Sequence, residues 1–261
     1  MTEPPFLLRA DNAAVATITL NRPQLRNALS QGMLQALLAE LGALATDASV
    51  RVVVIAGAGP AFCAGHDLKE LRAAQYALAY TEELFATCAE VMQGIVRLPK
   101  PVIASVHGIA TAAGCQLVAS CDLAVAADDA RFATPGVNIG LFCSTPMVAL
   151  SRNIGHKAAM QMLLTGELID APTALRFGLV NEIVAATELT ARTATLARQI
   201  ATKPPLTLAI GKEAFYRQAE LPLAGAYAYA ARAMTANLQT QDAQEGIGAF
   251  LDKRQPVWCG H

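Results

Sequence analysis

Short runs of β-branched residues recur along the first part of the chain and predict β-strands. Residues 13–20 partly alternate between apolar and polar side chains, which is typical of a strand. Residues 51–56 (RVVVIA) and 101–106 (PVIASV) are mostly β-branched and are followed by a glycine or a polar residue. All three segments are therefore predicted to be strands.

Stretches with apolar residues at helical spacing separate these strands. The first helix is expected to be capped by Ser30 and to run to about Thr46. Further helices are predicted at 67–74, 81–98, about 112–120 and after residue 145, with a short strand at 122–126. Because strands and helices alternate, parallel βαβ units are favoured and the predicted fold class is α/β.

The pattern becomes wholly helical after Pro204 and Pro205. Helices are predicted at about 206–218, 222–239 and 242–252. The sequence therefore predicts two parts, a mixed core over residues 1–204 and a helical C-terminal subdomain over residues 205–261.

Composition adds an expectation about assembly. Hydrophobic residues make up 54% of the chain and charged residues only 16%. This is more apolar than an average soluble domain, so part of the surface is expected to be buried between subunits. We therefore expect an oligomer.

Charge and cysteine usage exclude several partners. The formal net charge is −1 and no run of Lys or Arg is present, so neither a nucleic acid nor a membrane surface is expected as a partner. The long apolar stretch 101–128 contains polar residues and is interpreted as buried core. The six cysteines are scattered without metal-ligand spacing, so no metal site is expected. Reduced cysteines and a chain start that lacks the features of a targeting segment predict a cytoplasmic protein.

Three stretches of the chain are candidates for a functional site. Residues 62–70 (FCAGHDLKE) form a tight Ala-Gly turn before a helix; this is either an anion site or an ordinary turn capped by Asp67. Residues 108–116 (GIATAAGCQ) are small, which permits either close approach of a ligand to the backbone or close helix packing. Residues 132–144 (FATPGVNIGLFCS) read as a loop. A dinucleotide site is not indicated, because G-x-G-x-x-G is absent.

Together and in this order, the three stretches resemble the crotonase (enoyl-CoA hydratase/isomerase) superfamily, whose motifs run FxAGxD, GxAxGGGxxL and FxxPExxxG. The resemblance is closest to a mitochondrial branch named only as enoyl-CoA hydratase domain-containing proteins. It also includes residues 18–23 (ITLNRP), 164–167 (LTGE), 174–180 (ALRFGLV) and 245–254 (EGIGAFLDKR), and so covers nearly the whole chain.

The resemblance implies a spiral of ββα units with a helical C-terminal part that forms a homo-trimer or hexamer. It also implies a site for an acyl-CoA, with coenzyme A as part of the thioester substrate and no permanently bound cofactor. The thioester oxygen would lie between the backbone N–H groups of His66 and Ala113. The residues implied in coenzyme A binding are Arg26, Ala28, Ala64, Asp67 and Leu68, with Phe250 and Lys253 reaching a neighbouring subunit's coenzyme A.

Two departures from the family pattern affect the expected chemistry. Hydratases of this family carry glutamates where this chain has Gln116 and Gly136. Since each acid/base role is worth roughly 10²- to 10⁴-fold, ordinary hydration of crotonyl-CoA is expected to be nearly lost. Restoring both glutamates together is expected to raise hydration, provided that a side chain fits at Gly136.

Other groups are candidates for the missing acid/base role. Ser144 matches a position where dienoyl-CoA isomerases of the family carry an aspartate, and the side chain of His66 lies beside the implied thioester site. Asn138 and Cys143 share the segment of Ser144. Each of these residues also has an ordinary structural interpretation, such as a histidine that bonds the backbone of a turn.

Three hypotheses follow from the resemblance and the departures. The first is an enzyme that forms an enolate from a CoA thioester, of the hydratase/isomerase type. The second is a decarboxylase of a malonyl-type CoA, in which loss of carbon dioxide makes the enolate without an enzymic base. The third is a non-catalytic acyl-CoA binding protein.

Overall fold

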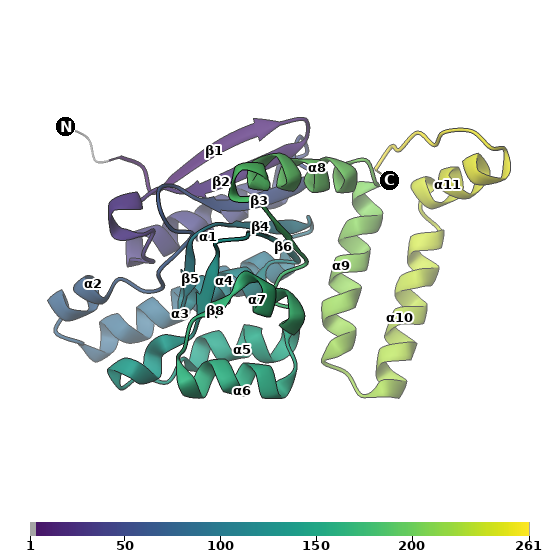
Figure 1. The fold of residues 1–261 in the computed structure, drawn as a ribbon. Helices are drawn as coiled ribbons and strands as arrows, with labels where there is room; N and C mark the ends of the chain where they lie inside the picture. Colours follow the sequence, from purple (N-terminus) through teal and green to yellow (C-terminus); the bar gives the residue numbers. More distant parts are fainter. Residues whose placement is uncertain (1–3, 261) are drawn as a thin grey trace.

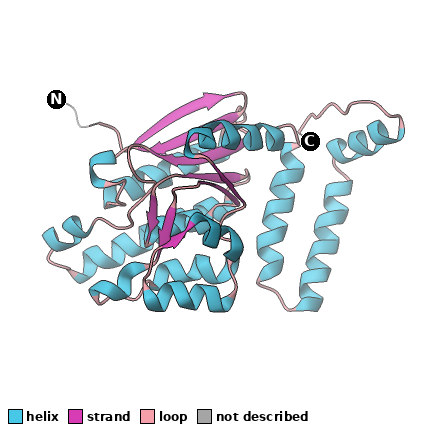
Figure 2. Ribbon diagram, in the orientation of Figure 1, coloured by secondary structure: helices cyan, strands magenta, loops and turns pink. Residues whose placement is uncertain are grey.

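The computed structural model describes residues 4–260 and shows two β-sheets enclosed by helices, with a helical arm at the C-terminal end (Figures 1 and 2). The larger sheet has six strands in the order β1-β2-β3-β4-β6-β9. Their bounds are β1 (Leu7–Asn12), β2 (Val15–Leu20), β3 (Val52–Gly57), β4 (Val102–Val106), β6 (Leu123–Ala127) and β9 (Glu182–Val184). β1 and β2 are antiparallel, and the other neighbouring strands of this sheet are parallel.

The smaller sheet brings two of the three candidate stretches together. It consists of β5 (Ile109–Thr111), β7 (Arg131–Ala133) and β8 (Ile169–Asp170), in that order. β5 belongs to the small-residue stretch and pairs in parallel with β7, which begins the third stretch. The sheet therefore places residues 112 and 134 side by side at the ends of adjacent strands.

Helices cover both faces of the larger sheet because its strands carry apolar side chains in both directions. Val53 and Ile55 of β3 belong to the apolar cluster that contains α1 (Gln31–Thr46) and α3 (Leu78–Arg97). Val52 and Val54 point the other way, toward α8 (Leu189–Ala201). Further helices around the smaller sheet are α4 (Ala113–Ser120), α5 (Ser144–Asn153), α6 (His156–Thr165) and α7 (Ala171–Phe177). The α/β prediction is confirmed.

Most of the predicted element boundaries are close to the observed ones. Ser30 caps α1 by accepting a hydrogen bond from the Met33 N–H, and Asp67 caps α2 (Leu68–Ala73) in the same way through the N–H groups of Lys69 and Glu70. The strand expected at 13–20 begins only at residue 15, because Ala13 and Ala14 form a tight turn with positive φ. β1, on the other side of that turn, was not predicted.

The helical prediction after Pro205 is confirmed by α9 (Pro205–Ala219), α10 (Leu223–Leu238) and α11 (Gln241–Leu251). α9 and α10 lie side by side and, together with α11, form an arm that projects from the core (Figure 1). The arm leaves large apolar side chains exposed, namely Phe215, Leu223, Tyr227, Met234, Phe250 and Leu251. No helix within residues 4–260 is long and apolar enough to cross a membrane. Residues 1–3, part of the chain start used for the localisation prediction, lie outside the described residues.

A buried ion pair joins the arm to the core. Lys212 Nζ of α9 donates hydrogen bonds to Asp122 Oδ2 at 2.7 Å and to two backbone carbonyl oxygens of the core. Tyr216 OH, one helical turn further along α9, donates to Asp122 Oδ1 at 2.9 Å. Asp122 Oδ2 also accepts the Val102 N–H at the start of β4. Asp122 therefore fixes the arm to the beginning of β4 and β6, two inner strands of the larger sheet.

Candidate functional site

The first two candidate stretches run side by side. The Cys63 N–H donates to the Ile109 carbonyl oxygen at 3.0 Å, and the Thr111 N–H donates back to Cys63 O at 2.9 Å. The hydroxyl of Thr111 adds a bond to the Ala64 carbonyl oxygen at 3.1 Å. The Ala-Gly turn is therefore held against the strand that leads into α4.

Small residues allow this close approach. Gly65 has φ of +90°, and a Cβ there would lie 2.8 Å from Ala112 Cβ and 3.3 Å from the backbone nitrogen of Ala113. A Cβ on Gly114 would lie much too close to the carbonyl oxygen of Cys63. The small residues of the stretch 108–116 therefore permit close packing, which was one of the two interpretations of this stretch. Close packing does not exclude a ligand site at the same place.

Two backbone N–H groups at this contact have no acceptor. Among residues 4–260, neither the His66 N–H nor the Ala113 N–H donates a hydrogen bond, although the neighbouring Asp67 N–H donates to Leu29 O. Ala113 is the first residue of α4, where N–H groups lack helical partners and the helix dipole is positive. The two donors lie on adjacent backbone segments.

Ala112, which precedes α4, has a strained backbone. Its φ is +51° and its ψ is −118°, a region that only glycine adopts readily. The N–H of Ala112 donates to Ala133 O at 2.9 Å, which holds this residue against β7. Such strain persists only when surrounding contacts enforce it and is common at functional sites.

Replacing Ala112 with glycine is expected to stabilise the protein by about 1 kcal/mol, because relief of the strain exceeds the entropy cost of a glycine. The measurement is the free energy of unfolding in urea. Ala119→Gly, inside the following helix α4, is the control and should destabilise by about 1 kcal/mol, since the backbone of Ala119 is helical. An equal loss in both variants would show that Ala112 is not strained.

The side chain of His66 packs against an aromatic ring. Its ring meets the ring of Phe85 on α3 edge to face, with centroids 5.2 Å apart and planes at 89°. Both ring nitrogens are buried and form no hydrogen bond of ordinary geometry with the described residues, although the ring lies close enough to the Leu29 backbone to interact with it. Burial lowers the pKa of His66, and the backbone of Leu29 opposes this only in part. His66 is therefore a neutral imidazole at pH 7, with one donor and one acceptor nitrogen.

Gln116 and Gly136, the two positions where the resemblance implies glutamates in hydratases, differ in how much room they leave. Gln116 lies one turn into α4, is only 4% exposed, and has a buried Oε1 without a partner. At Gly136, a Cβ would lie 2.5 Å from Leu141 O and 2.9 Å from Cys143 Sγ. Because the carbonyl oxygen belongs to the backbone, a side chain does not fit at Gly136 unless residues 141–143 move. The condition attached to restoring both glutamates is therefore not met in this conformation.

The other candidates on the third stretch have local structural partners. Ser144 is exposed at the start of α5 and its hydroxyl donates to Phe142 O at 3.3 Å. Asn138 donates to Gly166 O. Cys143 is buried, and burial raises the pKa of its thiol. A raised pKa keeps the Cys143 thiol protonated at neutral pH.

The two cysteines within the first two candidate stretches, Cys63 and Cys115, are not reactive groups. Cys63 and Cys115 are buried free thiols, and burial raises the pKa of each to about 12. A thiol with so high a pKa is not nucleophilic at neutral pH. The part of the chain that the structure describes contains no cluster of His, Cys, Asp and Glu side chains that could hold a metal ion.

Most residues implied in coenzyme A binding lie next to the turn. The Ala64 N–H donates to Arg26 O at 3.0 Å, and Ala28 O accepts a bond from the guanidinium of Arg22. That guanidinium also forms an ion pair with Asp67 at 3.1 Å. Leu68 follows as an exposed residue at the start of α2. The structure therefore brings Arg26, Ala28, Ala64, Asp67 and Leu68 together on one side of the candidate site.

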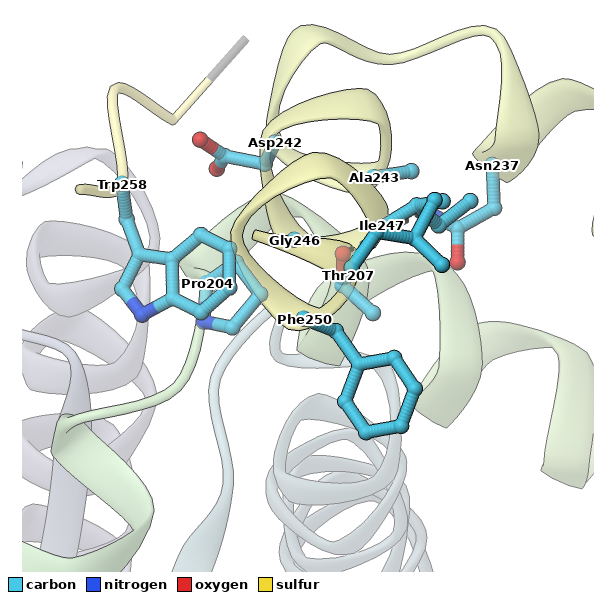
Figure 3. A pocket seen from close by; sticks show the side chains of 10 residues that line it. Pro204, Thr207, Asn237, Asp242, Ala243, Gly246, Ile247, Phe250 and Trp258 are labelled. Atoms are coloured by element: carbon cyan, nitrogen blue, oxygen red, sulfur yellow. Dashed lines mark hydrogen bonds between the residues drawn. The ribbon is translucent and has the colours of Figure 1, made fainter. Parts of the chain in front are cut away.

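Phe250 and Lys253 do not join this group within one chain. α11, which carries Phe250, lies at the opposite end of the molecule from α2 (Figure 1). Phe250 is 81% exposed and borders a pocket of about 340 Å³ between α9, α11 and Trp258 (Figure 3). Trp258 Nε1 donates to Thr202 O, which holds the C-terminal tail beside this pocket.

Three features of the site were not predicted from the sequence. They are the contact of Phe85 with His66, the strained backbone of Ala112, and the buried hydroxyl of Thr134 beside α4. Of these three features, only the strain at Ala112 had a signal in the sequence. The motif of the crotonase superfamily has a glycine at this position, and this chain has an alanine.

Comparisons with known proteins agree with the resemblance stated from the motifs. The family model described as "Enoyl-CoA hydratase/isomerase" matches residues 10–261. Mouse "Enoyl-CoA hydratase domain-containing protein 3, mitochondrial" is 48% identical over 98% of this chain and 85% of the relative. The Escherichia coli "2,3-dehydroadipyl-CoA hydratase" is 38% identical over 94% of this chain and 95% of the relative.

Solved structures confirm the crotonase-like fold. An enoyl-CoA hydratase from Mycobacterium smegmatis superposes with a TM-score of 0.95 at 56% identity, covering 98% of this chain and 99% of that one. Human enoyl-CoA hydratase domain-containing protein 3 gives a TM-score of 0.93 at 47% identity, covering 97% and 100%. The mouse relative is named as mitochondrial, so the cytoplasmic prediction finds no support there. On the family model, the relatives and the fold together, this chain belongs to the enoyl-CoA hydratase/isomerase family.

Proposed function

We propose that the protein is an acyl-CoA enzyme of the hydratase/isomerase type that holds the thioester oxygen between the N–H groups of His66 and Ala113. The observation that carries this proposal is the pair of N–H groups left without acceptors on two adjacent backbone segments. Two preorganised donors stabilise the negative oxygen of an enolate, and the positive end of α4 adds to this stabilisation.

The acid/base equipment of this site is incomplete. Gln116 can orient water or a substrate group, but an amide cannot accept a proton at neutral pH. Gly136 offers no side chain. Efficient water addition to a simple enoyl-CoA is therefore not the proposed activity. The proposed role of the site is to stabilise an enolate through its two backbone N–H groups.

Coenzyme A is proposed to bind as part of the substrate, along the surface formed by Arg26, Ala28, Ala64, Asp67 and Leu68. The exposed apolar side chains of α9–α11 support a homo-trimer or hexamer. In such an assembly Phe250 and Lys253 would reach the coenzyme A bound to a neighbouring copy. The arm over residues 205–261 is proposed to be the part that makes these contacts.

Decarboxylation of a malonyl-type CoA is a second candidate, favoured by the closed position at Gly136. When the bond to the carboxylate breaks, its electron pair forms the enolate, carbon dioxide leaves, and water later supplies the proton. This route needs no enzymic carboxylate. A non-catalytic acyl-CoA binding protein would use the same pocket without turnover.

The proposed function is tested by incubating the protein with a panel of acyl-CoAs, read by mass spectrometry, together with calorimetry. Turnover separates an enzyme from a binding protein, and release of carbon dioxide identifies the decarboxylase. Binding of acetyl-CoA or octanoyl-CoA at millimolar concentration is expected. If neither binds while NAD does, the proposal is wrong.

Removing one donor tests the site itself. Ala113→Pro eliminates one N–H at the first position of α4, where proline is compatible with a helix. Turnover of the best substrate is expected to fall roughly 10²- to 10³-fold, with little change in affinity for free coenzyme A. Circular dichroism checks that the variant folds. Unchanged turnover in a folded variant would remove Ala113 from the mechanism.

A further inference from the structure

Residues 254–260, here called the C-terminal strap, fold back along α11. The strap begins with an ion pair in which the guanidinium of Arg254 donates to both carboxylate oxygens of Glu245, at 2.6 and 2.7 Å. Glu245 Oε1 also accepts the Val257 N–H at 2.9 Å. Two-point pairs of this kind fix the relative orientation of the two side chains. Glu245 therefore ties the start of the strap to its own helix.

The end of the strap is held by Asp242 and by the end of α8. Asp242 is 1% exposed, and its two oxygens accept the N–H groups of Cys259 and Gly260 at 2.7 and 2.9 Å. Trp258 Nε1 donates to Thr202 O, directly after α8, at 2.9 Å. The indole ring of Trp258 also lies against α11 (Figure 3). The strap thus links α11 to the core.

α11 has few other contacts that could fix its orientation. Only Asp242 and Ala249 are buried among its 11 residues. A helix of this length is marginal without tertiary contacts, because nucleation is costly. The carboxylates of Asp242 and Glu245 therefore hold α11 through the strap, and apolar packing adds little.

A left-handed turn at Lys253 joins α11 to the strap. The φ of Lys253 is +56°. The Lys253 N–H donates to Phe250 O at 3.3 Å and the Arg254 N–H donates to Ala249 O at 3.0 Å, which is the pattern of a Schellman motif. Glycine is the usual residue at this position, because other residues are disfavoured at positive φ. The exposed side chain of Lys253 forms no ion pair within residues 4–260.

A strained lysine without a partner in its own chain points to a ligand outside that chain. Strained backbone persists only where the surrounding contacts enforce it, and it is common at ligand sites. Phe250 is 81% exposed and lies three residues before Lys253, at the same end of α11. An aromatic ring can stack on a base and an ammonium can pair with a phosphate. The two side chains therefore match the nucleotide part of coenzyme A.

We propose that Glu245 and Asp242 are positioning residues for the nucleotide part of the coenzyme A bound to a neighbouring copy. Through the strap they fix the turn at Lys253, and the turn sets the direction in which Phe250 and Lys253 project. This inference rests on the proposed function, since it requires that the protein binds an acyl-CoA and that these two side chains reach it.

The first test compares octanoyl-CoA with octanoyl-pantetheine, which lacks the nucleotide, by calorimetry. Glu245→Gln removes the charge of the ion pair at nearly constant shape. It should weaken binding of octanoyl-CoA about tenfold and leave binding of octanoyl-pantetheine unchanged. Glu213→Gln is the control, because Glu213 pairs with Arg217 at 2.9 Å on α9, outside the strap. It should change neither affinity.

The second test asks whether Glu245 acts through the two projecting side chains. In a protein that already carries Phe250→Ala and Lys253→Ala, adding Glu245→Gln should cause no further loss of affinity for octanoyl-CoA. Lys253→Gly relaxes the turn, so it should raise the Tm by about 2 °C while it weakens binding of octanoyl-CoA. A residue with a purely structural role would not separate stability from affinity in this way.

Sedimentation checks that the variants assemble as the wild type does. If Glu245→Gln does not fold or assemble, Arg254→Lys decides the question, because it keeps the charge but loses the two-point geometry. It should show a smaller loss that is again confined to octanoyl-CoA. Equal losses for both octanoyl compounds, or a loss that persists without Phe250 and Lys253, would overturn the inference.

The wild-type protein separates this inference from the proposed function. Tighter binding of octanoyl-CoA than of octanoyl-pantetheine is expected, because only octanoyl-CoA carries the nucleotide. If both compounds bind equally well, the nucleotide is not recognised and the inference is wrong, although the proposed function stands. If neither binds, the proposed function fails and the inference fails with it.

Discussion

Lys212→Met is expected to destabilise the protein by about 3–5 kcal/mol. This is the largest effect expected of any single substitution at the contact between the arm and the core. Lys212 is buried and donates to Asp122 and to the backbone oxygens of Ile95 and Lys100. Its side chain is 8% exposed. Removing the ammonium leaves the Asp122 carboxylate mostly buried without a positive partner, and it also leaves two carbonyl oxygens unpaired.

The free energy of unfolding in urea measures this effect, with Lys203→Met as the control because Lys203 is exposed. The double variant Lys212→Met with Asp122→Asn should recover part of the loss, since it removes both charges of the pair. If Lys212→Met and Lys203→Met unfold at the same urea concentration, Asp122 does not hold the arm.

The parts of the fold that were predictable depend on local signals. The buried strands β3 and β4 are continuous apolar runs, and Ser30 caps α1 with a side chain that the sequence displays directly. β1 was missed because its sequence, LLRADN, does not alternate between apolar and polar residues and is mostly exposed; the strand exists because it pairs with β2. Pairing of this kind is not encoded in the pattern of one segment.

In the candidate site, too, features with a local cause were predicted and features that depend on contacts between distant segments were not. The turn at Gly65 and the start of α4 were located by motifs, because small residues and caps have a local cause. Whether Gly136 leaves room for a side chain depends on Leu141 and Cys143, which approach it only in the folded chain. The contact of Phe85 with His66 likewise joins α3 to a turn. It could not be predicted, because no sequence motif links the two residues.

Wild-type protein is expected to hydrate crotonyl-CoA roughly 10⁴-fold or more below relatives that carry both glutamates, because two acid/base groups are absent. Gln116→Glu alone should give a small gain, as it places one carboxylate beside the two backbone donors. Adding Gly136→Glu is now expected to give no further gain, in contrast to the expectation from sequence. The reason is the backbone oxygen of Leu141, 2.5 Å from the new Cβ.

Gly136→Ala separates the two possible reasons for failure, since it adds the Cβ without a carboxylate. Overpacking against Leu141 O should cost about 1–3 kcal/mol in both Gly136 variants. Hydration is measured by the loss of the enoyl thioester absorbance and stability by urea unfolding. If Gly136→Ala is as stable as the wild type and the double variant hydrates rapidly, residues 141–143 move aside easily. The two absent glutamates, and not the closed position at Gly136, would then be what separates this site from a hydratase.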